Sequence, residues 1–179
     1  MTPQITLQAF DCWLSERDLS FEAVIVGGSA LALLGLIDRP TRDVDVIAPG
    51  LPEAIAGAAR AFATEMSRAG QPLAADWLNT GPIAVADALP AGWEERLRLI
   101  FAGSALRLHT LGRQELLLTK LFALCDRGTD LADCLAMAPS AEALRDAEGW
   151  LLRQDASEIW PSLVGETLNH LRTRLGHGV

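Results

Sequence analysis

The chain has 179 residues, of which 50% are hydrophobic, and its formal net charge is −8 at pH 7. This composition supports a folded core and excludes an extensively disordered chain. The negative charge argues against binding to long duplex DNA, whose affinity comes largely from Lys and Arg neutralising phosphates. No apolar run is long enough to span a membrane and no signal-peptide pattern stands at the N-terminus, so we expect a cytoplasmic protein without a membrane partner.

The first third of the chain predicts alternating helices and strands. Apolar residues recur at helical spacing in some segments, and short runs rich in Val, Ile and Phe favour strands in others. The expected elements are helix 4–17, strand 21–26, helix 29–35, strand 43–48, and a helix from Pro52 to about Ala69.

The rest of the chain predicts a loop, a hairpin and a helical half. Pro, Gly and Asn residues in 71–95 indicate a long loop with short ordered pieces. Segments 97–101 and 105–110 favour an antiparallel hairpin around Gly103 and Ser104. From Arg113 onward the pattern is helical, with breaks at 128–129, 139–140 and near 161. The sequence therefore predicts an α+β fold: a small mixed sheet flanked by helices in 1–112, followed by a helical part in 113–179 that packs on it.

The three cysteines lack metal-ligand spacing and predict neither a zinc site nor a disulfide framework. Cys125 and Cys134 are expected to fill a core. Trp77 and Trp93 border the long loop, where they could either stack a nucleotide base or cap the core.

The segment 24–48 is the most informative about function. Gly27 and Gly28 follow an apolar strand, and glycine lets a ligand approach the main chain because it has no Cβ. Ser29 stands where a helix N-cap is expected, so the free N–H groups of the helix start would favour a phosphate. Residues 43–46 read Asp-Val-Asp-Val, and the two-residue period of a strand brings both carboxylates to one face.

Two carboxylates on one strand face repel each other unless a cation lies between them. Magnesium binds through one or two carboxylates together with substrate phosphates, so Asp43 and Asp45 predict a site for Mg²⁺ or Mn²⁺. The alternative is a simple turn followed by a solvated pair of aspartates. A dinucleotide-binding fold is disfavoured, since residues 27–29 lack the G-x-G-x-x-G spacing.

At these residues the chain resembles the nucleotidyltransferase superfamily, whose signature is Gly-Gly or Gly-Ser, a spacer, and then Asp-x-Asp. The matching residues are Gly27, Gly28 and Ser29, then Asp43 and Asp45, with a basic lead-in at Arg39, Thr41 and Arg42. The resemblance implies that the turn and the arginines hold a nucleoside triphosphate and that the aspartates carry the metal ions for nucleotidyl transfer.

Residues 115–133 hold a second candidate group. Lys120 and Arg127 stand seven apart on nearly one helical face, and Lys120 is the one lysine in the chain. Gly128 suits a left-handed helix end and Thr129 the N-cap of the next helix. Asp130 and Asp133, three residues apart, fall in the first turns of that helix.

This order of residues is similar to a helical segment of bacterial nucleotidyltransferases of the AbiEii toxin type. The resemblance implies that Lys120 and either Asp130 or Asp133 line the active cleft. The alternative is that Lys120 and Arg127 are exposed helix charges and that the two aspartates favour a helix N-terminus.

Catalytic members of the superfamily commonly add a third carboxylate from a neighbouring strand. The predicted strands 97–101 and 105–110 contain no Asp or Glu. His109 lies on the polar face of the second strand, where it could act as a base or serve as a hydrogen-bonded structural residue. The remaining candidates for the missing group lie in the long loop: Asp76, Asp87, Glu94 and Glu95.

The predicted function is the magnesium-dependent transfer of a nucleoside monophosphate from an NTP to a hydroxyl of an RNA end, a protein or a small molecule. The resemblance makes 1–112 a nucleotidyltransferase-like core. It also implies a toxin–antitoxin or phage-defence role, with a cognate toxin or antitoxin as partner. The alternative is a catalytically degenerate fold that binds nucleotide or protein, which the missing strand carboxylate would favour.

Overall fold

The computed structural model describes residues 2–41 and 43–177. The chain divides into two compact units, residues 1–112 and 113–179. A mixed sheet with helices builds the first unit and helices build the second, so the α+β prediction is confirmed. Arg42, one of the predicted nucleotide-binding residues, lies outside the described part. Among the described helices, none has both the length and the apolar composition that a membrane crossing requires.

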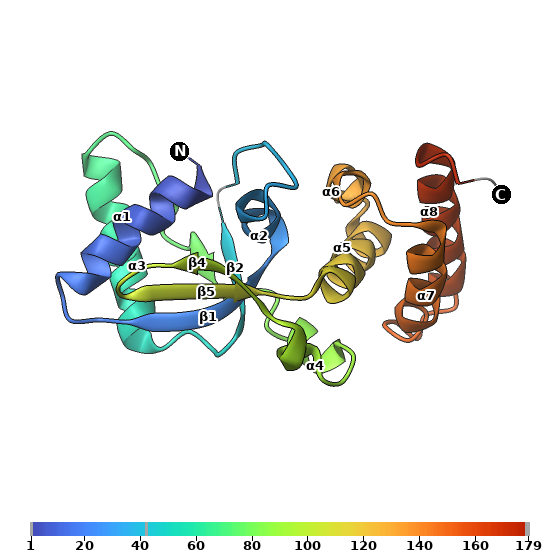
Figure 1. Ribbon diagram of the computed structural model, residues 1–179, viewed down its shortest axis with the longest axis horizontal. Helices are drawn as coiled ribbons and strands as arrows, with labels where there is room; N and C mark the ends of the chain where they lie inside the picture. Colours follow the sequence, from blue (N-terminus) through green and yellow to red (C-terminus); the bar gives the residue numbers. More distant parts are fainter. Residues whose placement is uncertain (1, 42, 178–179) are drawn as a thin grey trace. The chain divides into compact units, whose positions relative to one another are not determined.

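The described residues of the first unit form a five-stranded sheet in the order β3-β2-β1-β5-β4 (Figure 1). Strand β1 is antiparallel to β2 and parallel to β5, while β3 is parallel to β2 and β4 is antiparallel to β5. The strands are β1 (Phe21–Val26), β2 (Val44–Ala48), β3 (Leu78–Asn79), β4 (Arg98–Ala102) and β5 (Leu106–Thr110). This order places the strand that leads into the glycine turn directly beside the strand that carries the aspartates.

Helices α1 (Pro3–Ser15) and α3 (Glu53–Arg68) supply apolar side chains to the core on one face of the sheet. Phe10 of α1 meets Phe62 of α3 and Trp77, with ring centroids 5.2 and 5.1 Å away. Burial of such rings removes a large apolar area from water and stabilises this core. The short helix α2 (Gly27–Leu33) follows β1 directly.

The long connection between α3 and β4 contains short ordered pieces, as predicted. These are β3, the helix α4 (Val85–Ala88) and the 3-10 helix η1 (Trp93–Arg96). Trp77 is 1% exposed and donates its indole N–H to the carbonyl of Ala59, and Trp93 is 8% exposed. Both tryptophans therefore belong to the core, and stacking on a base is not their role.

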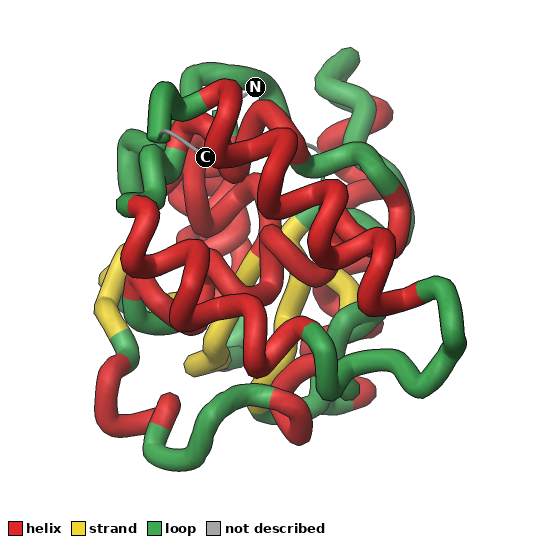
Figure 2. Tube along the Cα trace, turned by 90° about the vertical axis from the view of Figure 1, so that its right-hand side faces the viewer, coloured by secondary structure: helices red, strands yellow, loops and turns green. Residues whose placement is uncertain are grey.

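The second unit consists of helices, which Figure 2 draws in red. Those described are α5 (Arg113–Arg127), α6 (Leu131–Ala136), α7 (Ala141–Leu151) and α8 (Trp160–Arg174). Phe122 packs between Trp150 and Trp160 in its core, at centroid distances of 6.5 and 5.7 Å. Cys125 and Cys134 are buried, as expected.

Several helix boundaries differ from the predictions, among them the ends of α1 at Ser15 and α2 at Leu33, each two residues before the predicted end. Helix α2 begins at Gly27, two residues before Ser29. Asp130 is the N-cap residue of α6, one position after Thr129. Helix α8 begins at Trp160, so Pro161 lies in its first turn and starts the helix rather than breaking it, since a first-turn residue needs no intrahelical N–H bond. Gly128 does end α5 in the left-handed conformation, with φ of +70°.

Candidate functional site

Gly27 follows the end of β1, begins α2 and lies against Asp45 of the neighbouring strand β2. Its φ of +78° lies in the left-handed region, which glycine adopts without steric cost. Val26, the residue before it, pairs with Asp45 in the β1–β2 ladder. A Cβ on Gly27 would overlap the Asp45 carboxylate at Oδ2. Glycine is therefore required here for two reasons, the backbone angle and the close approach of Asp45.

Gly28 lies close to Arg39 and Thr41, in the segment that precedes Asp43. A Cβ at Gly28 would stand 2.9 Å from Cγ2 of Thr41 and 3.5 Å from Nη2 of Arg39. The structure thus brings Gly28 close to Arg39, two residues predicted to bind the nucleotide, and to Thr41 of the basic lead-in. A larger residue at position 28 would displace Thr41 before any ligand binds.

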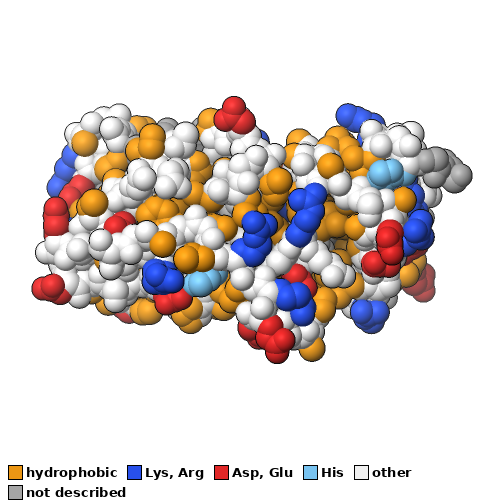
Figure 3. Space-filling model, in the orientation of Figure 1, with side chains coloured by type: hydrophobic (Ala, Val, Ile, Leu, Met, Phe, Trp, Pro, Cys, Tyr) orange, Lys and Arg blue, Asp and Glu red, His pale blue; other side chains and the backbone are white. Residues whose placement is uncertain are grey.

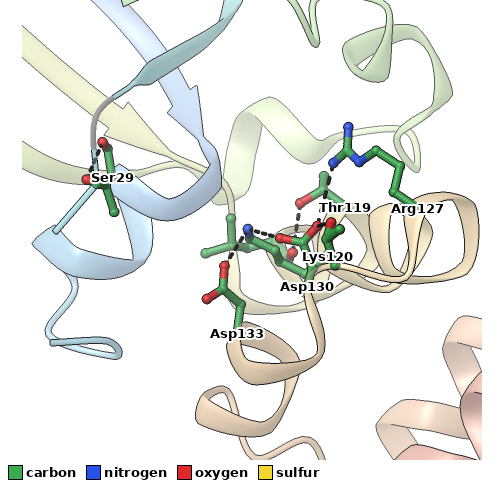
Figure 4. A network of polar contacts seen from close by, with 9 residues as sticks. Ser29, Thr119, Lys120, Arg127, Asp130 and Asp133 are labelled. Carbon is green, nitrogen blue, oxygen red and sulfur yellow. Dashed lines mark hydrogen bonds and ion pairs between the residues drawn. The ribbon is translucent and has the colours of Figure 1, made fainter. Parts of the chain in front are cut away.

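Ser29 has a different role from the predicted N-cap. Val26 occupies the N-cap position of α2, and Ser29 is a buried residue inside the helix, 1% exposed. Its hydroxyl donates to the carbonyl of Asp43 at 2.5 Å and is 2.9 Å from Oγ1 of Thr41 (Figure 4). Since a serine hydroxyl has one proton, Thr41 is the donor in the second bond. Ser29 therefore fastens the helix after the glycine turn to the start of the Asp-x-Asp segment.

The two aspartates alternate with buried valines. Asp43 is exposed and Asp45 half-buried, whereas Val44 and Val46 are buried at 3% and 0% exposure. This alternation is what a strand with both carboxylates on one face produces. The carboxylates of Asp43, directly before β2, and Asp45, on β2, have the donor chemistry that Mg²⁺ uses together with substrate phosphates.

Asn79 is a residue of this region that the sequence analysis did not assign. It lies on β3 in register with Asp45, and its Nδ2 donates to Oδ1 of Asp45 at 3.1 Å. The available signal was a polar residue directly after the buried Trp77 and Leu78. A two-residue strand is too short for its pairing to be recognised from the sequence.

His109 forms a hydrogen bond with Glu22, with Nε2 and Oε1 2.7 Å apart, on neighbouring strands β5 and β1. Arg107 lies 3.9 Å from the same oxygen. The loop candidates for a third carboxylate, Asp76, Asp87, Glu94 and Glu95, are all exposed. In 2–41 and 43–177 no three His, Cys, Asp or Glu side chains gather as a metal-binding group.

The second predicted group lies within the helical unit and forms an ion cluster. Nζ of Lys120 donates to Oδ1 of Asp130 at 2.8 Å and to Oδ2 of Asp133 at 2.7 Å (Figure 4). Lys120 is 6% and Asp133 2% exposed. The alternative reading of Lys120 as an exposed helix charge is therefore wrong. Arg127 does extend into solvent, with its guanidinium 3.5 Å from Asp130.

Burial alone would lower the pKa of the Lys120 ammonium, because a charge is costly away from water. The hydrogen bonds and negative charges of Asp130 and Asp133 outweigh burial and raise that pKa above its usual value. Lys120 therefore stays protonated throughout the neutral range. Burial raises the pKa of the neighbouring Cys134 thiol to about 12, with a further rise from Asp130, so this thiol stays neutral.

A glycine turn at the end of β1, with Asp43 directly before the adjacent strand β2 and Asp45 on it, is the arrangement expected of a nucleotidyltransferase-type protein. The family described as "Nucleotidyltransferase of unknown function (DUF6036)" matches residues 5–140, and the chain belongs to it. The match includes both the glycine turn and the Lys120 cluster. The comparison with curated proteins and the comparison with solved structures each found no match.

Proposed function

We propose that this protein is a magnesium-dependent nucleotidyltransferase that moves a nucleoside monophosphate from an NTP to a hydroxyl acceptor. The observation that carries the proposal is the contact between Gly27 and Asp45, where a side chain on the glycine would overlap the carboxylate. This contact supports one site in which the turn would bind phosphate and Asp45 would bind the metal ion. Membership of a nucleotidyltransferase family supports the same activity.

Asp43 and Asp45 would hold Mg²⁺ or Mn²⁺. The fit rests on the donor set, since two carboxylates on one face suffice when phosphate oxygens and water complete the coordination. The bound ion would supply charge neutralisation to the phosphates and lower the pKa of an attached hydroxyl.

The residues of the chain would bind and orient the triphosphate. Gly27 and Gly28 are half-buried, and phosphate oxygens would approach the main chain of this turn beside Arg39, whose planar guanidinium suits phosphate and lies close to Gly28. In the transfer, the acceptor oxygen bonds to the α-phosphorus while the bond from that phosphorus to the bridging oxygen breaks. Pyrophosphate leaves, and the acceptor's proton passes to water.

The acceptor is an RNA end, a protein hydroxyl or a small molecule. Acidic and basic side chains are interspersed with apolar ones on the face that Figure 3 shows, and the net charge is −8. These features favour a small or short acceptor over a long nucleic acid. The resemblance to AbiEii-type proteins suggests a role in toxin–antitoxin or phage-defence systems, with a cognate partner protein.

The test is incubation of the full chain with each α-labelled NTP and Mg²⁺, in the presence of RNA or of protein extract. We expect label transfer and pyrophosphate release, both abolished in the variant D43N/D45N. The variant should stay folded, because removing neighbouring like charges relieves repulsion. Unchanged NTP affinity in D43N/D45N would refute the metal assignment.

Two observations favour a second function, a nucleotide-binding module without catalysis. Asn79, an amide, stands beside Asp45 on the neighbouring strand β3, and the described residues contain no group of three potential metal ligands. In this case the chain binds NTP and Mg²⁺ with the same dependence on Asp45 but releases no pyrophosphate with any acceptor.

A further inference from the structure

Asn79 contacts the carboxylate on which the proposed metal site depends. Strand β3 pairs with β2 in parallel, and the register sets Asn79 opposite Asp45. The Asn79 side chain is half-buried, and its Nδ2 lies 3.1 Å from Oδ1 of Asp45. The opposite carboxylate oxygen, Oδ2, lies against Gly27. Asp45 is thus held on one side by an amide and on the other by the glycine turn.

The orientation of the Asn79 amide is itself determined. The backbone N–H of Gly81 donates to Oδ1 of Asn79 at 2.8 Å, which identifies the carbonyl end of the amide. The NH₂ end must then face Asp45, because an amide presents its two donors on the nitrogen. The turn after β3 therefore determines which group of Asn79 meets the carboxylate.

We propose that Asn79 is a positioning residue that holds Asp45 in its cation-binding orientation. This inference rests on the proposed function and adds a specific residue to it. Outer partners that donate hydrogen bonds to a ligating carboxylate orient it, and their removal typically weakens metal binding about tenfold or more. An amide performs this task without adding charge, whereas an aspartate at position 79 would repel Asp45.

The test compares Mn²⁺ affinity, measured by electron paramagnetic resonance, for the full-length wild type, N79A and N169A. Asn169 is a matched control, since its amide also bonds to another side chain, Arg172, but on helix α8. We expect N79A to weaken Mn²⁺ binding about tenfold, while circular dichroism shows an unchanged fold, and N169A to bind like the wild type. An N79A affinity within twofold of the wild-type value would overturn the proposal.

A second measurement needs no variant and covers the case in which N79A fails to fold. In ¹⁵N-labelled wild-type protein, saturating Mg²⁺ should shift the side-chain NH₂ resonances of Asn79 and leave those of Asn169 in place. An Asn79 amide that does not respond to bound Mg²⁺ would overturn the positioning role. A wild type that binds no Mn²⁺ or Mg²⁺ at all would overturn the proposed function itself, which separates the two failures.

Discussion

Ser29 links two parts of the candidate site through one buried hydroxyl. It donates to the carbonyl of Asp43, and Thr41 donates to it in turn. We expect S29A to lower the free energy of unfolding by about 1–3 kcal/mol, because the buried acceptor loses its donor. We also expect weaker NTP binding, since the segment before Asp45 loses its attachment to α2. Urea denaturation and equilibrium dialysis would measure the two effects.

The S29T variant is the matched control, because it keeps the hydroxyl. It should retain more NTP affinity than S29A. Equal affinities for the wild type, S29A and S29T would show that the bond to Asp43 does not matter for binding.

Lys120 combines a structural role with a predicted catalytic one. K120M should destabilise the protein by about 3–5 kcal/mol, because it leaves the buried carboxylate of Asp133 without the ammonium of Lys120. K120R keeps the charge and should retain part of both stability and NTP affinity, since a planar guanidinium does not match a compact ammonium. Thermal unfolding and NTP titration of both variants would test this.

A variant that removes all three charges of the Lys120 cluster distinguishes the structural role of Lys120 from its predicted catalytic role. The variant K120M/D130N/D133N removes the buried charges together and should recover most of the lost stability. If Lys120 binds the phosphates of the NTP, this variant should still have a lower NTP affinity or transfer rate than the wild type. Wild-type affinity and turnover in the stable triple variant would assign Lys120 to structure alone.

At the scale of elements, Asp11 fastens helix α1 to the turn between β4 and β5. Its carboxylate accepts the backbone N–H groups of Ser104, Ala105 and Leu106 at 3.0, 2.8 and 2.7 Å. A Cβ on Gly103 would overlap this carboxylate, which explains a glycine in the turn. Burial alone would raise the pKa of Asp11, but the three N–H donors outweigh it and hold the pKa below its usual value.

We therefore expect D11N to lower the free energy of unfolding by about 1.5–3 kcal/mol at pH 7, since an amide turns a donor toward a backbone N–H. A lowered folded-state pKa contributes stability above the unfolded value of about 3.9, and this contribution is lost as the pH falls through the folded-state pKa. The difference between wild type and D11N should thus shrink as urea denaturation is repeated from pH 7 down to pH 3. An exposed control, D126N, should change stability by less than about 0.5 kcal/mol at pH 7.

At the scale of the whole molecule, each of the two units has its own core, and the predicted ligand contacts are concentrated in the first. Saturating Mg²⁺ and NTP should therefore protect backbone amides locally, because a ligand stabilises the conformation that it contacts. We expect slower hydrogen exchange in 24–48 and 78–81 and unchanged exchange in 160–174. Hydrogen-exchange mass spectrometry would measure this, and protection spread evenly along the chain, or absent, would contradict it.

The sequence by itself determined the four longer strands, most helices and the two motifs of the candidate site, but not strand β3. Strands β1 and β2 were predicted to within one residue because their apolar periods depend on local spacing alone. The glycine turn and the paired aspartates were recognised for the same reason, since residue type and short separation carry the signal. The end of α5 before Gly128 was predicted because glycine readily adopts the left-handed conformation that often follows a helix.

Only the tertiary structure decided which of these residues meet. Ser29 reaches Asp43 because β2 lies beside β1, and Asn79 reaches Asp45 because two residues of β3 extend the sheet. Lys120 is buried because α6 folds back and brings Asp130 and Asp133 to its ammonium. Each partner is 10 to 34 residues away along the chain. Their pairing depends on strand register and helix docking, which the packing of the whole core determines and no local pattern encodes.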